Sequence, residues 1–269
     1  MPLRCRRSGV LAVAFLAAAG VVVWGARRRP TGASEGGPLE PAPATRPVAT
    51  TAPSRLRLAS FNIHSGVGTD GRLDLGRVAG VLRGCDLDAL QEVRGAVPWR
   101  DHDEARALGE LLGAQSLFLP SERQWWRRAF GNAVLTDTRI THWRRTPLPH
   151  DLGRASRNMT RLEVPFGCGV LNVLVTHLST VRNGPSLEFR ALRDAFLNLP
   201  TPAVLMGDMN RGPDDPEMSS LLETPGVQNP LGKRRRFDYI LLRGVRWRDA
   251  GVVENDASDH PMVWVEIES

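Results

Sequence analysis

The sequence predicts one α/β domain over residues 55–269. Short apolar runs of strand length recur from residue 55 onward, and apolar residues fall at helical spacing between some of them. Hydrophobic residues make up 42% of the 269 residues and charged residues 24%, which excludes a disordered, collagenous or disulfide-scaffold chain. A chain of this composition can bury a core of ordinary size.

The elements follow from the spacing of apolar residues. The alternation that starts at Leu56 and Leu58 predicts a first strand ending at Asn62. The apolar residues at 75, 78, 79 and 82 share one helical face, and Asp74 before them is a suitable N-cap. Two more helices are predicted, at 104–112 and 186–199. Further strands are predicted at 88–91, 133–136, 162–164, 170–176, 203–206, 239–242 and 262–267.

The N-terminal residues 1–29 predict membrane targeting. Residues 8–26 form an uncharged run of 19 residues, long enough to nearly cross a bilayer core of about 30 Å. An uncleaved anchor and a cleaved signal peptide both fit this run. The arginines that follow it are a poor cleavage neighbourhood, so we expect an anchor that attaches the chain to a membrane with an extracytoplasmic domain.

The excess of positive charge also lies at the N-terminus. The net charge is +6, and six arginines but no acid fall in residues 1–30, which leaves 29 basic and 29 acidic residues in the rest of the chain. A neutral body has no general electrostatic attraction for polyanions, although a local basic groove is compatible with this balance. Residues 30–54 contain six prolines and predict an extended, disordered linker.

Cysteine usage excludes a zinc site. The three cysteines form no CxxC pair and show no Cys/His zinc spacing. In an exported domain Cys85 and Cys168 either pair or stay as free thiols, and the sequence leaves both alternatives open.

Polar residues gather where the apolar runs end. Four runs finish in Asn62 and His64, in Gln91 and Glu92, in Thr176 and His177, and in Asp208 and Asn210. A fifth group, Ser258, Asp259 and His260, precedes the last strand. If that strand runs antiparallel to the others, all five groups meet on one rim of the sheet. Oxygen-rich rims suit Mg²⁺, and the imidazoles beside them suit proton transfer or phosphate contact.

Seven short motifs carry a family resemblance in the correct order. They are FNIH (61–64), LQEV (90–93), GNA (131–133), THL (176–178), GDMN (207–210), FDYI (237–240) and SDHP (258–261). With them the chain resembles the endonuclease/exonuclease/phosphatase superfamily of DNase I-like phosphoesterases. The resemblance implies a two-layer β-sandwich flanked by helices. It also implies a hydrolase that uses Mg²⁺, or Mn²⁺, to cut a phosphate ester by in-line attack of water.

The same resemblance implies a role for each matching residue. The implied metal ligands are Glu92, Asn62 and Asp259. The implied catalytic residues are His177, Asp208, Asn210, Asp238 and His260, with Asp238 orienting His260. The implied contacts to the substrate phosphate are Asn62, His64 and Asn210. This set of residues is compatible with one metal ion or with two. It also leaves open which group acts as the general base.

The substrate stays open between nucleic acid and a phospholipid or its head group, and a non-catalytic binding module is the third alternative. The abasic-site nucleases of the family that the chain resembles use a tyrosine near the phosphate. The only tyrosine here, Tyr239, follows Asp238 in its strand, so abasic-site specificity is not expected. The Trp125 and Trp126 pair fits either a base-stacking platform or an ordinary loop, and the basic stretch 233–236 fits phosphate steering or a solvated loop. We expect a monomer without a protein partner.

Overall fold

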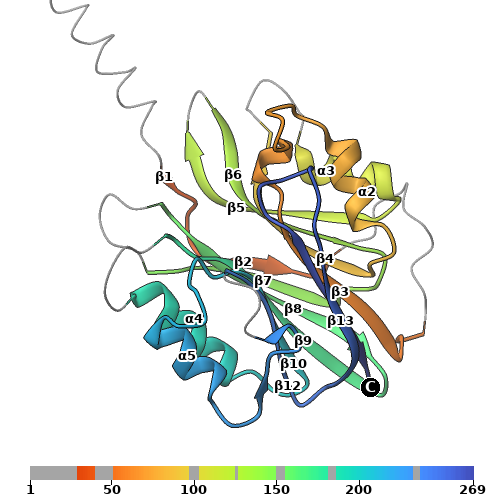
Figure 1. Ribbon diagram of the computed structural model, residues 1–269, viewed down its shortest axis with the longest axis vertical. Helices are drawn as coiled ribbons and strands as arrows, with labels where there is room; N and C mark the ends of the chain where they lie inside the picture. Colours follow the sequence, from red (N-terminus) through yellow and green to blue (C-terminus); the bar gives the residue numbers. More distant parts are fainter. Residues whose placement is uncertain are drawn as a thin grey trace, which may run out of the picture.

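Two β-sheets pack face to face in the computed structural model, and each carries helices on its outer side (Figure 1). The structure describes residues 29–39, 51–96, 103–124, 127–149, 155–180, 186–232 and 237–269. The expected two-layer sandwich flanked by helices is therefore confirmed.

Among the described residues, the first sheet has seven strands with a mixed topology. Its order is β1 (Arg29–Pro30), β5 (Gln115–Gln124), β6 (Arg127–Thr136), β4 (Leu87–Arg94), β3 (Arg55–Asn62), β14 (Met262–Glu268) and β13 (Arg246–Val253). Strands β3 and β4 are parallel, whereas β14 runs antiparallel to β3. The carboxyl ends of β3 and β4 and the start of β14 therefore lie at one edge of the sheet.

The second sheet also has seven strands. Its order is β11 (Val227–Gln228), β12 (Asp238–Arg243), β10 (Ala203–Asp208), β9 (Gly169–His177), β8 (Asn158–Phe166), β7 (His142–Pro147) and β2 (Glu35–Gly37). Strands β9 and β10 are parallel and β12 is antiparallel to β10. This sheet thus repeats the arrangement of the first, with two parallel strand ends beside the start of an antiparallel strand.

In the described part of the chain, four α-helices cover the outer faces of the sandwich. Helices α2 (Leu75–Leu82) and α3 (Glu104–Leu112) pack on the first sheet, and α4 (Leu187–Leu197) and α5 (Pro216–Leu222) on the second (Figure 1). Each begins at a side chain that accepts a backbone N–H, as the predicted Asp74 cap does from Arg77. The 3₁₀ turn η1 (His64–Gly66) follows β3.

Three buried apolar clusters hold these layers together. One lies between the sheets and includes Leu58 and Val204, a second joins α2 and α3 to the first sheet, and a third joins α4 and α5 to the second. Strand residues alternate between these clusters, as Ala89 and Leu90 of β4 do. The central strands are therefore buried on both faces, and the polar side chains of the site stand at or near their ends.

Several strands lie outside the sequence prediction. Strand β13 is missed because it is an edge strand whose first four residues are exposed, so its sequence has no apolar alternation. Strand β7 is similar, with two arginines among its six residues. Strand β5 contains Pro120, which argues against a strand in sequence reasoning, although the ladder tolerates it beside a register shift.

The expectation of a disordered linker over 30–54 does not hold for its first part. Strand β1 pairs with β5 and strand β2 with β7, so residues 29–37 add one edge strand to each sheet. The buried Arg145 explains this attachment, because its guanidinium donates to Glu35 Oε1 at 2.7 Å and to the Ala33 carbonyl at 3.0 Å. Residues 40–50 lie outside the described part.

The proposed membrane segment 8–26 also lies outside the described residues. Within the described part, none of the helices combines the length and the apolar character that a bilayer crossing requires. Trp125, Trp126 and the basic stretch 233–236 are likewise outside it. Both described cysteines, Cys85 and Cys168, are free thiols.

Candidate active site

The polar strand ends of the two sheets meet at one rim of the sandwich. Asn62 ends β3 and Glu92 lies near the end of β4, whereas His177 and Asp208 end β9 and β10. The sequence analysis placed these groups on the rim of a single sheet. The rim belongs to both sheets, because the parallel pairs of the two layers end on the same side.

Asn62 joins the two sheets across this rim. Its Nδ2 donates to Asp208 Oδ2 at 3.1 Å and to Glu92 Oε1 at 3.3 Å, and the residue is 1% exposed. Its Oδ1 accepts the backbone N–H of His64 at 3.1 Å. One amide thus fixes a carboxylate of each sheet and the turn that follows β3.

Glu92 is presented toward the rim by an irregularity in β4. Its φ is +60°, and the pairing of β4 with β6 shifts register between Leu90 and Val93. Such bulges turn a side chain out of the regular alternation. Among the described residues, Asn62 is the hydrogen-bond donor to this carboxylate, which leaves Oε2 available for another ligand.

Asp208 is the most enclosed acid of the rim. It is 1% exposed, and its Oδ1 accepts the N–H of Asn210 at 2.8 Å. Burial and the neighbouring charge of Asp238 raise the pKa of Asp208 to about 6. Gly207 before it has a φ of +150°, and a Cβ there would clash with the Thr176 carbonyl, so the GDMN motif needs glycine where β10 meets β9.

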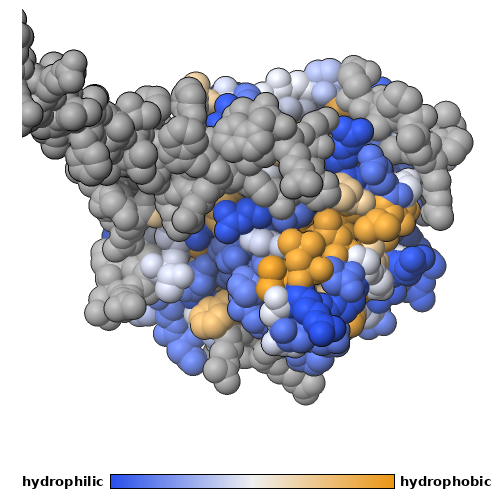
Figure 2. Space-filling model, turned by 90° about the horizontal axis from the view of Figure 1, so that it is seen from above, coloured by the Kyte–Doolittle hydropathy of each residue, from blue (hydrophilic) through white to orange (hydrophobic). Residues whose placement is uncertain are grey.

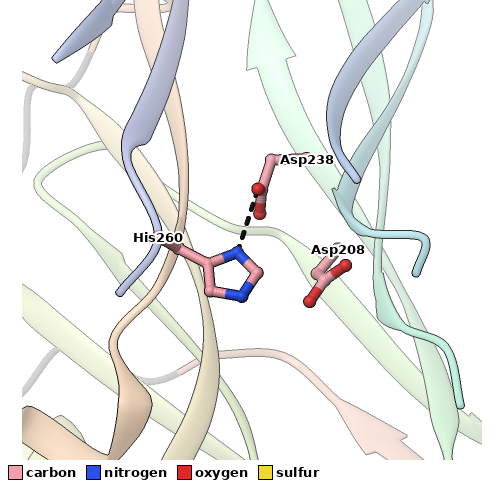
Figure 3. A group of neighbouring side chains, drawn as sticks. All are labelled: Asp208, Asp238 and His260. Atoms are coloured by element: carbon pink, nitrogen blue, oxygen red, sulfur yellow. Dashed lines mark hydrogen bonds and ion pairs between the residues drawn. The ribbon is translucent and has the colours of Figure 1, made fainter. Parts of the chain in front are cut away.

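Asp238 and His260 form a carboxylate–imidazole pair beside Asp208 (Figure 3). His260 Nδ1 donates to Asp238 Oδ2 at 3.0 Å, and the ring points its other edge toward Asp208. Burial alone would lower the pKa of His260, but the hydrogen bond and charge of Asp238 outweigh it and raise the pKa to about 9. His260 is therefore a cation at neutral pH.

His177 has the opposite character. Its Nδ1 faces Arg157 Nη1 at 3.2 Å and its Nε2 faces Asn210 Nδ2 at 3.1 Å, so each ring nitrogen meets a nitrogen that carries hydrogens. A doubly protonated ring would oppose both donors. Burial, followed by the charges of Arg157 and His260, holds the pKa of His177 well below its usual value. The two histidines are thus one neutral and one charged.

Arg157 is a site residue that the sequence analysis missed. It precedes β8 in a polar stretch without a strand-end motif, so no pattern singles it out. Besides His177 its guanidinium contacts Ser179 Oγ at 3.4 Å. Ser179 in turn donates to the buried Glu188 of α4.

His64 and Asp259 occupy the solvent side of the rim. His64 Nδ1 lies 3.7 Å from Asp259 Oδ1, and their side chains are 47% and 58% exposed. Both residues are thus brought to the site, but in positions that leave them free to meet a substrate or an ion from solvent.

The donor set fits a divalent cation. Glu92 and Asp259 offer exposed or half-buried carboxylate oxygens of the kind that Mg²⁺ and Mn²⁺ prefer. Deeper in the rim, ligand atoms of Asp208, Asp238 and His260 lie within 4.8 Å of one another, and the buried Asp238 Oδ1 has no hydrogen-bond partner. The site therefore has two neighbouring groups of oxygen donors.

The single tyrosine and His142 lie away from this chemistry. The Tyr239 hydroxyl donates to the Arg211 carbonyl at 3.2 Å and is buried, so it is not directed at a phosphate. His142 is exposed in β7, and His102 and His150 lie outside the described residues.

Comparison with known proteins identifies the class that this fold and rim define. The sequence profile of the endonuclease/exonuclease/phosphatase family matches residues 59–260. The chain therefore belongs to this family and is a phosphoester hydrolase, a class whose members generally use divalent metal ions. No curated protein matches the sequence significantly.

Solved structures of the same class share the fold. A family member from Beutenbergia cavernae DSM 12333 is 24% identical, with a TM-score of 0.64 over 80% of this chain and 72% of that one. One from Leptotrichia buccalis C-1013-b is 16% identical, with a TM-score of 0.67 over 80% of this chain and all of the other. D. rerio TDP2 in complex with a single-strand DNA product is 18% identical, with a TM-score of 0.61 over the same shares.

Proposed function

We propose that the protein is a Mg²⁺-dependent phosphodiesterase of nuclease type. The observation that carries this proposal is the convergence, on one rim, of a buried carboxylate with a raised pKa, Asp208, and a cationic imidazole, His260. A group that accepts a proton and a group that stabilises negative charge are the two needs of phosphoester hydrolysis by water. The DNA product held by the TDP2 structure supports nucleic acid as the substrate class.

Asp208 acts in this proposal as the general base. A carboxylate with a pKa near 6 is ionised at neutral pH and is still basic enough to accept a proton from an attacking water. Asn210 lies beside it, with a φ of +49° and its amide bonded to the Leu178 carbonyl at 2.8 Å. Its fixed amide would hold the phosphate in line with the water.

His260 and His177 would contact the phosphoryl group in different charge states. His260, charged by its pairing with Asp238, would stabilise the negative charge that develops on the phosphoryl oxygens. His177, kept neutral, would donate a single hydrogen bond from Nε2. The positive charge beside the phosphoryl group would come from His260, so His177 can act in its neutral form.

Glu92, Asn62 and Asp259 would hold the metal ion, and His64 would contact the phosphate from the solvent side. When bound, Mg²⁺ or Mn²⁺ supplies Lewis-acid stabilisation of the phosphoryl oxygens. The orientation of the carboxylates is the protein's contribution, and Asn62 provides it for Glu92.

The test is nicking of supercoiled plasmid by the full chain with Mg²⁺. Wild-type protein with metal should nick, whereas chelator or Asp208→Asn should stop it. Nicking by Asp208→Asn at the wild-type rate would refute the assignment of this site.

A phospholipid head group is the alternative substrate, and the apolar run 8–26 is the observation in its favour, because an anchored extracytoplasmic domain would work beside a bilayer. Release of head groups from phosphatidylcholine or sphingomyelin vesicles, without nicking of plasmid, would select this alternative.

A further inference from the structure

The first turn of α4 places a carboxylate inside the protein and an apolar side chain outside it. Glu188 is 4% exposed, whereas Leu187 before it is 54% exposed. This is the reverse of the usual pattern on a surface helix, in which leucine faces the core and glutamate faces water. A carboxylate that has lost its hydration must gain hydrogen bonds in exchange. The burial of Glu188 is therefore explained by what its carboxylate contacts.

Both carboxylate oxygens of Glu188 contact Ser179. Oε2 accepts the backbone N–H of Ser179 at 2.9 Å, and Oε1 accepts its hydroxyl at 3.0 Å. Leu178, the residue before Ser179, donates its N–H to the Asp208 carbonyl at 3.0 Å. The Leu178 carbonyl in turn accepts Asn210 Nδ2 at 2.8 Å. Glu188 thus holds a segment whose backbone bonds to two residues of the catalytic rim.

The hydroxyl of Ser179 also connects Glu188 to Arg157. Arg157 Nε lies 3.4 Å from Ser179 Oγ. A guanidinium only donates, so the hydroxyl accepts there and has its single hydrogen for another partner. Glu188 Oε1, at 3.0 Å, is a closer acceptor for this hydrogen than the Ala155 carbonyl, at 3.4 Å. The hydrogen bonds therefore run in one direction, from Arg157 through Ser179 to Glu188.

Charge acts along the same path. Burial lowers the pKa of Arg157, and the charge of Glu188 is the largest effect that opposes this lowering. A partly buried cation that loses its counter-charge is destabilised, so its side chain should move toward water. The guanidinium also faces His177, with Nη1 3.2 Å from Nδ1. Movement of Arg157 away from Ser179 would therefore withdraw Nη1 from His177 as well.

Helix α3 offers a comparison within the same molecule. Its first-turn Glu104 is 1% exposed, whereas Leu111 near its other end is 52% exposed. Figure 2, seen from the top of Figure 1 where α2 and α3 lie, shows apolar surface among hydrophilic side chains. Glu104 Oε2 accepts the backbone N–H of Arg94 at 2.8 Å, as Glu188 accepts that of Ser179. Glu104 thus acts on β4 of the first sheet, whereas Glu188 acts beside β9 of the second.

We propose that Glu188 is a positioning residue for the reaction, which holds Arg157 against His177 through the Ser179 hydroxyl. The inference rests on the proposed function, because it concerns the orientation of His177 toward the phosphoryl group. The effect requires a carboxylate that accepts two hydrogen bonds from one residue and supplies the negative charge opposite a partly buried guanidinium.

The test compares Glu188→Gln and Ser179→Ala with wild type, using the full chain, Mg²⁺ and supercoiled plasmid. Glu188→Gln keeps the shape of the side chain but removes its charge and one of its two acceptors, so kcat should fall by about tenfold with a smaller change in KM. Ser179→Ala removes the hydroxyl bridge and should have a similar effect, and it serves as the second variant if Glu188→Gln unfolds. Because both act through one path, the double variant should lose little more than either single variant does.

The ¹⁵N shifts of the His177 ring separate positioning from a general loss of stability. Glu188→Gln should move the shifts of both ring nitrogens, because Nδ1 loses its fixed donor. Glu104→Gln is the matched control, because it makes the same chemical change at a buried glutamate in the first turn of α3. It should lower the midpoint of urea unfolding without moving the His177 shifts.

Unchanged kcat and unchanged His177 shifts in both Glu188→Gln and Ser179→Ala would overturn the proposal. Additive losses in the double variant would do the same, and so would an equal movement of the His177 shifts in Glu104→Gln. Nicking that survives in Asp208→Asn would instead refute the proposed function. The His177 shifts do not depend on turnover, so they decide the role of Glu188 even if no plasmid is nicked.

Discussion

Arg157 Nη1 lies 3.2 Å from His177 Nδ1, on the opposite side of the ring from Asp208. Because a guanidinium has only donors, this contact requires a lone pair on Nδ1 and therefore a proton on Nε2. Nε2 lies 3.5 Å from Asp208 Oδ2. Asn210 Nδ2 also faces Nε2, but its two hydrogens have the Leu178 carbonyl and Asp208 Oδ2 as acceptors, so Nε2 can keep its proton. Arg157 thus selects the tautomer that directs an N–H into the site.

Without Arg157, the His177 ring should populate both neutral tautomers. We expect Arg157→Leu to lower kcat by about ten- to a hundredfold with a smaller change in KM. Residues that fix the orientation of a functional histidine through its second ring nitrogen commonly have effects of this size. Arg157→Lys should restore part of the activity, because it keeps a donor. The ¹⁵N shifts of the His177 ring should report Nδ1 as unprotonated in wild type and mixed in Arg157→Leu. Unchanged ring shifts in that variant would contradict the role.

Asp208→Asn should lower the activity and raise the stability of the protein. Turnover should fall by about a hundredfold or more, because the amide cannot accept the proton. Because its pKa is raised on folding, Asp208 contributes stability that is fully present below about pH 3.8 and is lost as the pH rises through about 6. At pH 7 we therefore expect Asn to increase the free energy of unfolding by about 1–2 kcal/mol. Urea unfolding at pH 5 and pH 7 checks this, and equal pH dependence in both proteins would exclude it.

The pH profile of kcat/KM should be bell-shaped. Activity should rise as Asp208 ionises near pH 6 and fall as His260 loses its proton near pH 9. Asp238→Asn removes the largest of the contributions that raise the pKa of His260 and leaves the burial that lowers it and the smaller effects of Asp208 and Asp259, so the alkaline limit should move down from about 9. An alkaline limit that stays at the wild-type pH in Asp238→Asn would remove His260 from this role.

Two groups of oxygen donors compete for the role of metal site, and two substitutions separate them. Glu92→Gln should weaken Mn²⁺ binding by about tenfold or more if Glu92, Asn62 and Asp259 hold the ion. Asp238→Asn should leave Mn²⁺ affinity within about twofold, because Asp238 is engaged with His260. Electron paramagnetic resonance of free Mn²⁺ measures both affinities. The reverse order would assign the ion to the deeper group.

The sequence predicts the parts of this molecule that depend on local patterns. Helices at 75–82 and 104–112 coincide with the structure because local sequence patterns mark them, and Asp74 marks the start of the first. Asn62 and Asp208 are found because they end buried strands. Arg157 is not, because its importance comes from a tertiary neighbour, His177.

The attachment of residues 29–37 shows the same limit. Proline, glycine and serine predict a linker, but pairing depends on free sheet edges and on the buried Arg145, which sequence patterns do not reveal. The consequence for experiments is that a truncation at residue 55 would remove β1 and β2 from the two sheets.

Glu35→Gln tests how firmly this segment is held. The substitution leaves the 97% buried side chain of Arg145 without its carboxylate, so we expect it to lower the free energy of unfolding by about 1–3 kcal/mol. Glu110→Gln is the matched control, because Arg106 Nε contacts Glu110 Oε1 at 3.1 Å in the same way but both side chains are at least 60% exposed. The control should cost less than about 0.5 kcal/mol. A larger loss of unfolding free energy for Glu35→Gln than for Glu110→Gln would mean that β1 and β2 contribute to the stability of the domain. Equal losses in urea unfolding would mean that they pair with the sheet edges without contributing to it.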